Sequence, residues 1–349
     1  MPGRRNAGPV DNSLCRRCQV VSPVITVRNE PLCEACFRKY VFTKVVKRLE
    51  TFRVRHSEPG QEPTLLIPLS FGAGSLSLLH ILSEHLKTQT ERTGRTGFKL
   101  HVLHVQNDIE SAQSNGHQEL LEKIEARFPT HAYSTIPFSG VSSLPDLPSD
   151  ASEENNRLDT LLATLDSATS QTDMLQILKR KLIVSFAKKT NCEAILWGDS
   201  TTRLAERTLA ETAKGRGSSL PYIVTDGTSP FGIAFYYPMR DLLSKEIVSF
   251  TSLIDPPLVH LVLQEKPRPS ISMKNTTIDD LMRQYFESVE QDYPSIVANV
   301  VRTTSKLQSP ALSEVEERCE LCEMPLHDQA PEKSRLCYGC IRTLPSAVG

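Results

Sequence analysis

Eight of the nine cysteines in this 349-residue sequence occur in two copies of one pattern, C-x2-C-x14-C-x2-C. The first copy comprises Cys15, Cys18, Cys33 and Cys36, and the second comprises Cys319, Cys322, Cys337 and Cys340. Each C-x-x-C turn can present two thiolates to one ion, and two such pairs can surround a zinc ion tetrahedrally. The spacer is one residue shorter than the usual range for zinc ribbons. The pattern predicts a zinc-ribbon-like module with four cysteine ligands at each end of the chain.

Two other uses of these cysteines are weaker interpretations. Disulfides need an oxidising compartment, but the polar N-terminal sequence lacks the apolar core of a secretory signal. No apolar run approaches the length of a membrane span, so we expect a cytoplasmic protein with no membrane contact. A redox role is disfavoured because redox C-x-x-C motifs usually occur singly beside a βαβ unit.

Charge is unevenly distributed along the chain. Residues 1–55 hold twelve arginines and lysines against four acidic residues, whereas residues 311–349 hold four basic and seven acidic residues. A metal-stapled module with a basic surface suggests a polyanionic partner. The alternative is an ordinary solvated helix face, because runs of charge are common on protein surfaces.

Several of these cations fall on a predicted helix that starts at Glu34. Phe37, Val41, Val45 and Leu49 recur at helical spacing and predict its buried face. The candidate nucleic-acid-binding residues of this segment are Arg16, Arg17, Arg38, Lys39, Lys44, Lys47 and Arg48.

A turn of small residues follows the first predicted strand of the middle region. The apolar run 64–69 predicts a buried strand, and an amphipathic helix is expected from Leu76 onward. Between them, residues 70–75 (SFGAGS) could aim backbone N–H groups and a helix N-terminus at a phosphate. The turn is neither a Walker loop nor a dinucleotide fingerprint. The alternative is that its small residues merely permit tight packing of strand and helix.

The middle of the chain alternates strands and helices. We predict further strands at 98–105, 132–137 and 193–198, and helices at 119–128, 174–190 and 199–213. This order predicts an α/β fold with a parallel sheet covered on both faces and ligands at the carboxyl ends of the strands. The expected domains are 1–56 (first cysteine module and basic helix), 64–265 (α/β domain with a mobile insertion at 140–173), 266–310 (helical segment) and 311–349 (second cysteine module).

Together these patterns resemble the PP-loop ATP pyrophosphatase family of tRNA-modifying enzymes. The loop of that family is typically S-G-G-x-D-S, and Ser70, Gly72 and Ser75 match its first, third and last positions. Phe71 replaces the second residue, and Gly74 replaces the aspartate. A carboxylate near phosphates can help to hold Mg²⁺, which glycine cannot do.

A second motif of the family also departs from its pattern. The motif G-H-N-x-D-D-x-A-E-T aligns with residues 198–207, where Gly198, Ala205 and Glu206 survive. Thr202 and Arg203 stand where the family has two adjacent acids. Thiolating members carry cysteines in the middle of the domain, but here the only such cysteine is Cys192, which we expect to be a buried small hydrophobe.

The resemblance implies a PP-loop core, similar to adenine nucleotide alpha hydrolases, between the two cysteine modules. It implies 2-thiolation of wobble uridine 34 of tRNA Lys, Glu and Gln, with ATP activating C2 and sulfur coming from a thiocarboxylated ubiquitin-like carrier. The expected cofactors are zinc at both four-cysteine sites, and ATP with Mg²⁺ for the complex as a whole. The residues that would contact a nucleotide are Ser70, Gly72, Gly74 and Ser75.

The departures from the motifs lead us to expect a non-catalytic or weakly catalytic, tRNA-binding subunit that forms a heterodimer with a competent PP-loop thiolase. One alternative is a self-sufficient ATP-dependent tRNA sulfurtransferase whose loop backbone suffices for ATP. Another is a zinc-ribbon interaction protein unrelated to thiolation, because a fold alone does not fix a function.

Overall fold

The computed structural model describes residues 13–106, 114–143, 160–263, 276–308, 317–326 and 335–344. Residues 144–159, nearly half of the insertion expected at 140–173, therefore lie outside the described residues, as do residues 264–275 and, in the second cysteine module, residues 311–316 and 327–334. Among the described helices, none combines the length and the apolar character needed to cross a membrane.

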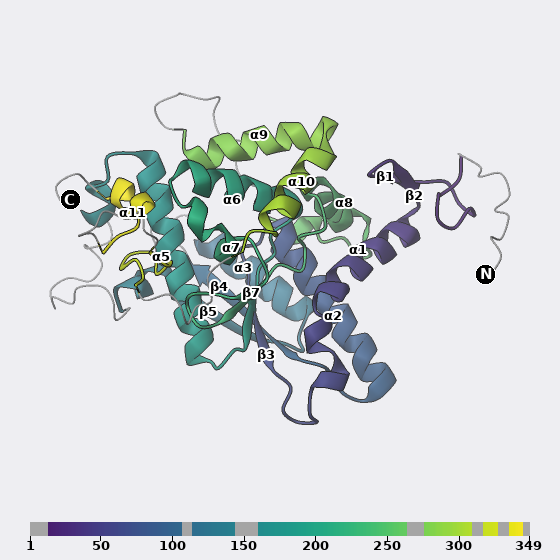
Figure 1. Ribbon diagram of the computed structural model, residues 1–349. Coiled ribbons are helices and arrows are strands. Elements are labelled where there is room, and N and C mark those ends of the chain that lie inside the picture. The colour runs from purple at the N-terminus through teal and green to yellow at the C-terminus, as the bar shows by residue number, and fades with distance from the viewer. Residues whose placement is uncertain are drawn as a thin grey trace.

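The N-terminal module consists of a short hairpin followed by a long helix. Strands β1 (Ile25–Val27) and β2 (Glu30–Leu32) pair in antiparallel fashion. Arg28 and Asn29 turn the chain between them with positive φ angles of 47° and 74°. Helix α1 (Glu34–Arg48) then leads to the body of the molecule and buries the apolar stripe predicted from its sequence (Figure 1).

The central sheet has six strands in the order β5-β4-β3-β6-β8-β7. Its strands are β3 (Thr64–Pro68), β4 (Lys99–Gln106), β5 (Ala132–Pro137), β6 (Ala194–Leu196), β7 (Gly227–Thr228) and β8 (Ala234–Tyr236). All neighbours are parallel except β7, which pairs with β8 in antiparallel fashion. The predicted parallel sheet is confirmed. Neither β7 nor β8, which have two and three residues, was predicted from the sequence.

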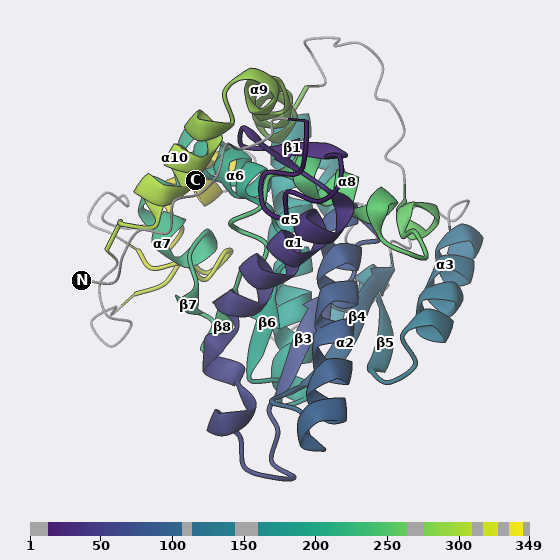
Figure 2. The same cartoon turned by 90° about the vertical axis from the view of Figure 1, so that its right-hand side faces the viewer.

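The alternating pleat of β3 divides the apolar core into two layers. Leu65 and Ile67 pack with α1, α2, α3 and α8, whereas Leu66 packs on the opposite face with α5, α6 and α7. The bounds of these helices are α2 (Ala73–Thr93), α3 (Ser114–Arg127), α5 (Ala168–Lys189), α6 (Thr201–Ala213), α7 (Leu220–Ile223) and α8 (Ser244–Leu253). Figure 2 shows α1 and α2 lying across the near face of the sheet. Short 3-10 turns connect several elements, at Glu50–Phe52, Val54–His56, Phe138–Ser143, Gly217–Ser219 and Val259–Leu261.

Three further helices complete the fold. α9 (Ile278–Asp292) begins with a capping box between Thr277 and Asp280, and α10 (Pro294–Thr304) follows it directly. Phe286, Val297 and Val301 of this pair pack into the same core layer as α6. α11 (Tyr338–Thr343) belongs to the second cysteine module and lies beside α5, at the opposite end of the molecule from β1 and β2 (Figure 1).

Candidate metal centres and a cation-lined cavity

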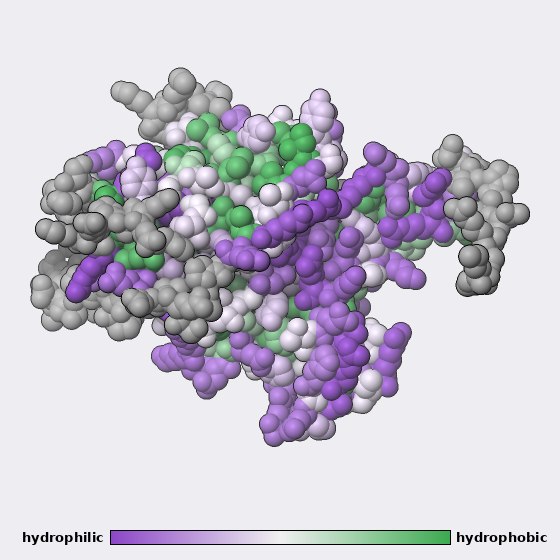
Figure 3. Space-filling view, viewed as in Figure 1, coloured by the Kyte–Doolittle hydropathy of each residue, from purple (hydrophilic) through white to green (hydrophobic). Residues whose placement is uncertain are grey.

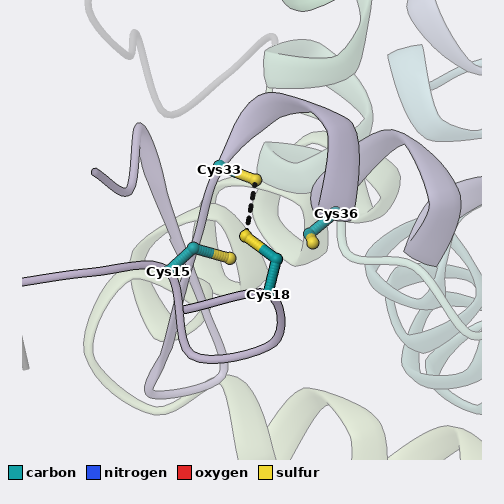
Figure 4. Close-up of side chains that lie close together, drawn as sticks. All are labelled: Cys15, Cys18, Cys33 and Cys36. Carbon is teal, nitrogen blue, oxygen red and sulfur yellow. Dashed lines mark hydrogen bonds between the residues drawn. The ribbon is translucent and has the colours of Figure 1, made fainter. Parts of the chain in front are cut away.

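The structure brings the first four cysteines together as one cluster. Their sulfur atoms all lie within 4.8 Å of one another, and the Sγ atoms of Cys18 and Cys33 are 3.7 Å apart (Figure 4). A tetrahedral zinc ion with bonds of about 2.3 Å to sulfur would hold its ligands about 3.8 Å apart. The site is preorganised because Cys33 is the N-cap of α1 and Cys36 lies in its first turn. The donor set and its spacing fit one tetrahedral metal ion.

The backbone around this cluster favours the thiolate of Cys15, whereas burial and the neighbouring thiols raise the pKa of Cys36. Burial alone would raise the pKa of Cys15, but N–H groups of Cys18, Cys33 and Arg17 oppose that effect and lower it to about 6. Because the thiolate is the form that binds metal, the loop is suited to a cation even though the sulfur is buried.

The last four cysteines repeat this arrangement. Their sulfur atoms also lie within 4.8 Å of one another, and the Sγ atoms of Cys322 and Cys337 are 3.7 Å apart. Cys337 is the N-cap of α11, and its backbone N–H donates to Cys319 Sγ at 3.3 Å. The neighbouring thiols lower the pKa of Cys319. Both cysteine clusters could therefore hold a metal ion.

The predicted basic residues divide into two groups in the structure. Arg48 contacts the α/β domain, where its guanidinium lies 2.7 Å from Asp241 and 3.7 Å from Asp226. Arg17 pairs with Glu30 at 3.1 Å, and both Arg17 and Lys44 lie over the ring of Tyr40.

The second group makes no ion pair with the α/β domain among the described residues. Arg16, Lys39 and Lys47 are exposed, and Arg38 lies over the ring of Phe42. Figure 3 shows hydrophilic residues along α1. The basic face that could meet a polyanion is therefore narrower than the sequence suggested, since Arg48 is engaged with the core.

The predicted phosphate-binding turn joins β3 to α2. The Ser70 and Ser75 hydroxyls are 3.3 Å apart, and Ser75 Oγ also donates to the Gly72 carbonyl at 3.1 Å. Phe71 has a positive φ of 57° and is buried against His104, with ring centroids 4.5 Å apart. The serine hydroxyls therefore form hydrogen bonds within the turn, and the buried ring of Phe71 packs the turn against the core.

Gly74 sits where the family motif has aspartate, and the structure leaves no room there for a side chain. A Cβ atom at Gly74 would collide with the carbonyl oxygen of Gly198, at the end of β6. Conversely, a Cβ at Gly198 would lie 2.7 Å from the backbone nitrogen of Ser75. The loop motif and the second motif thus contact each other through the backbones of Gly74 and Gly198. An aspartate at position 74 would fit only if these two backbone segments moved apart.

Thr202 and Arg203, which replace the two adjacent acids of the second motif, bond to neighbouring parts of the fold. Thr202 Oγ1 donates to Glu290 of α9 at 3.0 Å and accepts from the Ser244 N–H at 3.0 Å. Arg203 pairs with Glu206 at 2.7 Å. The Thr202 hydroxyl is therefore already hydrogen-bonded as donor and acceptor, and the Arg203 side chain carries no oxygen that could bind a divalent cation.

A cavity of about 560 Å³ opens at the carboxyl ends of β3 and β6, where ligands bind in sheets of this kind. It is lined by Ser70, Gly72, Gly74 and Ser75 of the turn, by Trp197 to Ser200, and by side chains of α5, α6 and α9. The predicted nucleotide-contacting residues therefore do line one cavity.

Two cations on α5 line this cavity, although they were not among the candidate site residues predicted from the sequence. Lys179 and Arg180 reach the cavity from the same helix face as Gln176 and Ile183. Burial lowers the pKa of Arg180 below its usual range. Spacing at i, i+3, i+4 and i+7 on a helix that follows the loop motif is the signal that could have identified them.

Cys192 is buried, as predicted, with 7% of its surface exposed. Burial raises the pKa of its thiol, which lies 3.3 Å from the Thr190 hydroxyl. A raised pKa disfavours the reactive thiolate.

Comparison with known proteins shows the family of this chain. A model of the family described as "Cytoplasmic tRNA 2-thiolation protein 2" matches residues 277–335. Proteins of that name from Phaeosphaeria nodorum and Pyrenophora tritici-repentis are 45% and 44% identical to the chain and are covered over 98% of their length. The chain belongs to the cytoplasmic tRNA 2-thiolation protein 2 family. A more distant member, from Aspergillus clavatus, is 36% identical over 99% of both chains.

A solved structure supports the fold of this family member. The U34-tRNA thiolase NcsA from Methanococcus maripaludis, determined with its [4Fe-4S] cluster, matches 93% of this chain and 95% of its own with a TM-score of 0.62. Sequence identity is 16%. The PP-loop fold expected from the sequence is therefore confirmed.

Proposed function

We propose that this chain is a subunit of a cytosolic complex that 2-thiolates wobble uridine 34 of tRNA Lys, Glu and Gln, and that it lacks a complete catalytic apparatus of its own. Family membership supports the pathway. The observation that carries the non-catalytic assignment is the contact between Gly74 and Gly198, which fills the space of the loop aspartate with backbone. A catalytic PP-loop thiolase is the proposed heterodimer partner.

The residues around the cavity support this division of labour. Thr202 and Arg203 bond to protein side chains, and Asp199 pairs with Arg207 at 2.9 Å. Mg²⁺ takes carboxylate and phosphate oxygens at close to octahedral geometry, so these substitutions and pairings disfavour a second metal–nucleotide site. ATP with Mg²⁺ is accordingly assigned to the partner, and sulfur is delivered to the complex by a thiocarboxylated ubiquitin-like carrier.

We assign zinc to the two four-cysteine clusters, because four thiolates at tetrahedral spacing suit that ion. The first cluster would hold α1 in place to present Arg16, Lys39 and Lys47 to tRNA. Phosphate contacts by such side chains position a nucleic acid without reading its sequence.

Apolar side chains on α9 and α10 support assembly with a partner. Leu281, Tyr285, Tyr293 and Ile296 are 44%, 50%, 61% and 45% exposed, and Figure 3 shows an apolar area over these helices. Large exposed apolar patches mark protein interaction sites. This face is the proposed contact with the thiolase.

The test combines cells and purified components. We expect 2-thiouridine in tRNA to disappear when the gene is deleted and to return when the wild-type chain or Cys192→Ala is expressed. The purified chain should make no thiolated tRNA from ATP and a sulfur donor until the thiolase partner is added.

Each alternative function predicts a different result. Thiolation by the chain alone would identify it as a self-sufficient sulfurtransferase. Unchanged 2-thiouridine after deletion would instead indicate a zinc-ribbon interaction protein outside this pathway.

A further inference from the structure

The second four-cysteine cluster is joined to the α/β domain by a buried network of charged side chains. Arg216 donates through Nε to Glu211 at 2.6 Å and through Nη2 to Asp173. Lys214 lies 2.9 Å from Glu211 and 3.0 Å from Asp173. All four residues have 6% or less of their surface exposed. Removing one member of such a buried set leaves its partner without a compensating charge, which is strongly destabilising.

Two contacts extend this network to the cysteine cluster. The remaining terminal nitrogen of Arg216, Nη1, lies 4.0 Å from Cys340 Sγ. Thr343 of α11 donates to the other carboxylate oxygen of Asp173 at 2.8 Å. One guanidinium therefore touches two core carboxylates and one cysteine sulfur, and one core carboxylate holds the helix that carries this cysteine.

Gly339 allows the Arg216 guanidinium to come this close to Cys340. A Cβ atom at Gly339 would lie 2.6 Å from Cγ and 2.9 Å from Nη1 of Arg216. Gly339 sits between the last cysteines, in the first turn of α11. The same Cβ would lie 2.9 Å from the Lys214 carbonyl oxygen, so a larger residue there would displace both the guanidinium and α11 from their present contact.

The first four-cysteine cluster is held differently. The hairpin of its module contacts the α/β domain through Arg28, which donates to the Asp241 carbonyl at 3.0 Å and lies 4.0 Å from Glu246. The side chain of Arg28 is 38% exposed, so water can screen that contact. Among the described residues, no buried cation of the core bonds to a sulfur of the first cluster.

The two clusters also differ in the electrostatic cost of burying their charge. Four thiolates around a divalent ion carry a net charge of about −2, which is costly to bury without a compensating charge or donor. Cys15 and Cys33 of the first cluster are buried too, but water can reach its Cys18, whereas Cys319, Cys322 and Cys340 of the second are all buried in the core layer of α5 and α6. We propose that Arg216 is the outer partner of the second metal centre, compensating the Cys340 thiolate and fixing α11 on the core. This assignment does not depend on the tRNA-modifying role.

The experiment measures metal release from the full-length chain. Cys33→Ser removes the first site, and zinc loss from the second is then followed with a colorimetric chelator. We expect Arg216→Gln to release zinc at least about 10-fold faster, as is usual when a partner of a metal ligand is lost. Gly339→Ala, which retains the arginine but displaces it, should act in the same direction.

Lys214→Gln provides the matched control, because Lys214 belongs to the same buried network but touches no sulfur. It should lower the unfolding temperature without accelerating zinc release from folded protein. Cobalt substituted for zinc reports the sulfur environment independently, and its thiolate charge-transfer band should shift in Arg216→Lys but not in Lys214→Gln. Equal release rates and unshifted cobalt spectra in all these variants would overturn the proposal.

Discussion

Gly74 and Gly198 approach so closely that neither position tolerates a side chain, and this contact makes a prediction at the scale of single residues. Gly74→Ala places a methyl group against a carbonyl oxygen. We expect a loss of stability of about 2 kcal/mol or more, because backbone cannot move aside as a flexible side chain can. Chemical denaturation of the purified chain measures this loss.

Gly72→Ala is the control in the same turn. Its Cβ would meet only Ser70 Oγ, at 3.4 Å, and its φ of −77° suits any residue. The cost should stay within about 1 kcal/mol. Equal costs at the two positions would mean that the loop and the end of β6 separate easily in solution.

His80 predicts a dependence of stability on pH. It is buried in α2 among the rings of Phe42, Phe128 and Phe250, and neither ring nitrogen has a hydrogen-bond partner in the described part of the chain. Burial, with smaller effects from Arg127 and Arg38, lowers its pKa from 6.5 to about 4. The folded chain therefore keeps this ring neutral while the unfolded chain takes up a proton below its ordinary pKa.

Stability from His80 is thus present above about pH 6.5 and is lost as the pH falls towards 4. Between pH 7 and pH 5, His80 should cost the wild-type chain about 2 kcal/mol of its free energy of unfolding, and we expect His80→Leu not to show this loss. Urea unfolding at both pH values measures the difference, with the surface substitution His260→Leu as control. If His80→Leu and wild type lose stability in parallel, the ring is solvated in the native state.

At the scale of elements, helix α1 separates cations that bind the core from cations that face solvent. Lys39 and Lys47 are exposed, whereas Arg48 pairs with Asp241. Reversing charge in the double variant Lys39→Glu/Lys47→Glu should weaken tRNA binding and reduce the slope of log K against log salt by about 2, since each lost phosphate contact contributes roughly one. Binding isotherms at several salt concentrations measure both quantities.

Arg48→Gln is the comparison within the same helix. It should leave the salt slope unchanged and instead loosen the contact of α1 with the α/β domain, seen as faster hydrogen exchange at the end of the helix. If the salt slope of tRNA binding fell only in Arg48→Gln, the tRNA surface would lie on the face of α1 that carries Arg48, not on the face of Lys39 and Lys47.

Features contained within one helix or strand could be predicted from the sequence, whereas contacts between distant segments could not. Strand β5 (Ala132–Pro137) and the stripe of α1 follow from periods contained within one segment. Arg48 was predicted as a nucleic-acid ligand, but its partner Asp241 lies 193 residues away in the sequence. The Gly74–Gly198 contact and the cavity position of Lys179 and Arg180 depend in the same way on tertiary packing. Sequence periodicity can place Lys179 and Arg180 on one face of α5, but it does not show which distant segment that face meets.

At the scale of the whole molecule, the two four-cysteine clusters share one ligand pattern but differ in how they are joined to the core. Figure 1 shows the hairpin of the first module and helix α11 of the second at opposite ends. Cys319, Cys322 and Cys340 pack into the core layer with α5 and α6, and the buried ions of Arg216 and Asp173 reinforce that contact. Removal of metal should therefore have local effects at one end and global effects at the other.

Cys33→Ser and Cys337→Ser test this asymmetry with the same chemical change. Each should release its own ion and unfold its own module, because small metal-stapled modules have too little core to stand alone. We expect Cys33→Ser to leave the unfolding temperature of the α/β domain within about 2 °C of wild type, whereas Cys337→Ser should lower it by roughly 5 °C or more, since α5 and α6 lose a packed neighbour and Arg216 loses a charged one. Differential scanning calorimetry combined with hydrogen exchange at β3 and β6 separates local from global unfolding. A larger fall in Cys33→Ser would mean that α1 and its module, rather than α11 and the buried network, set the stability of the central sheet.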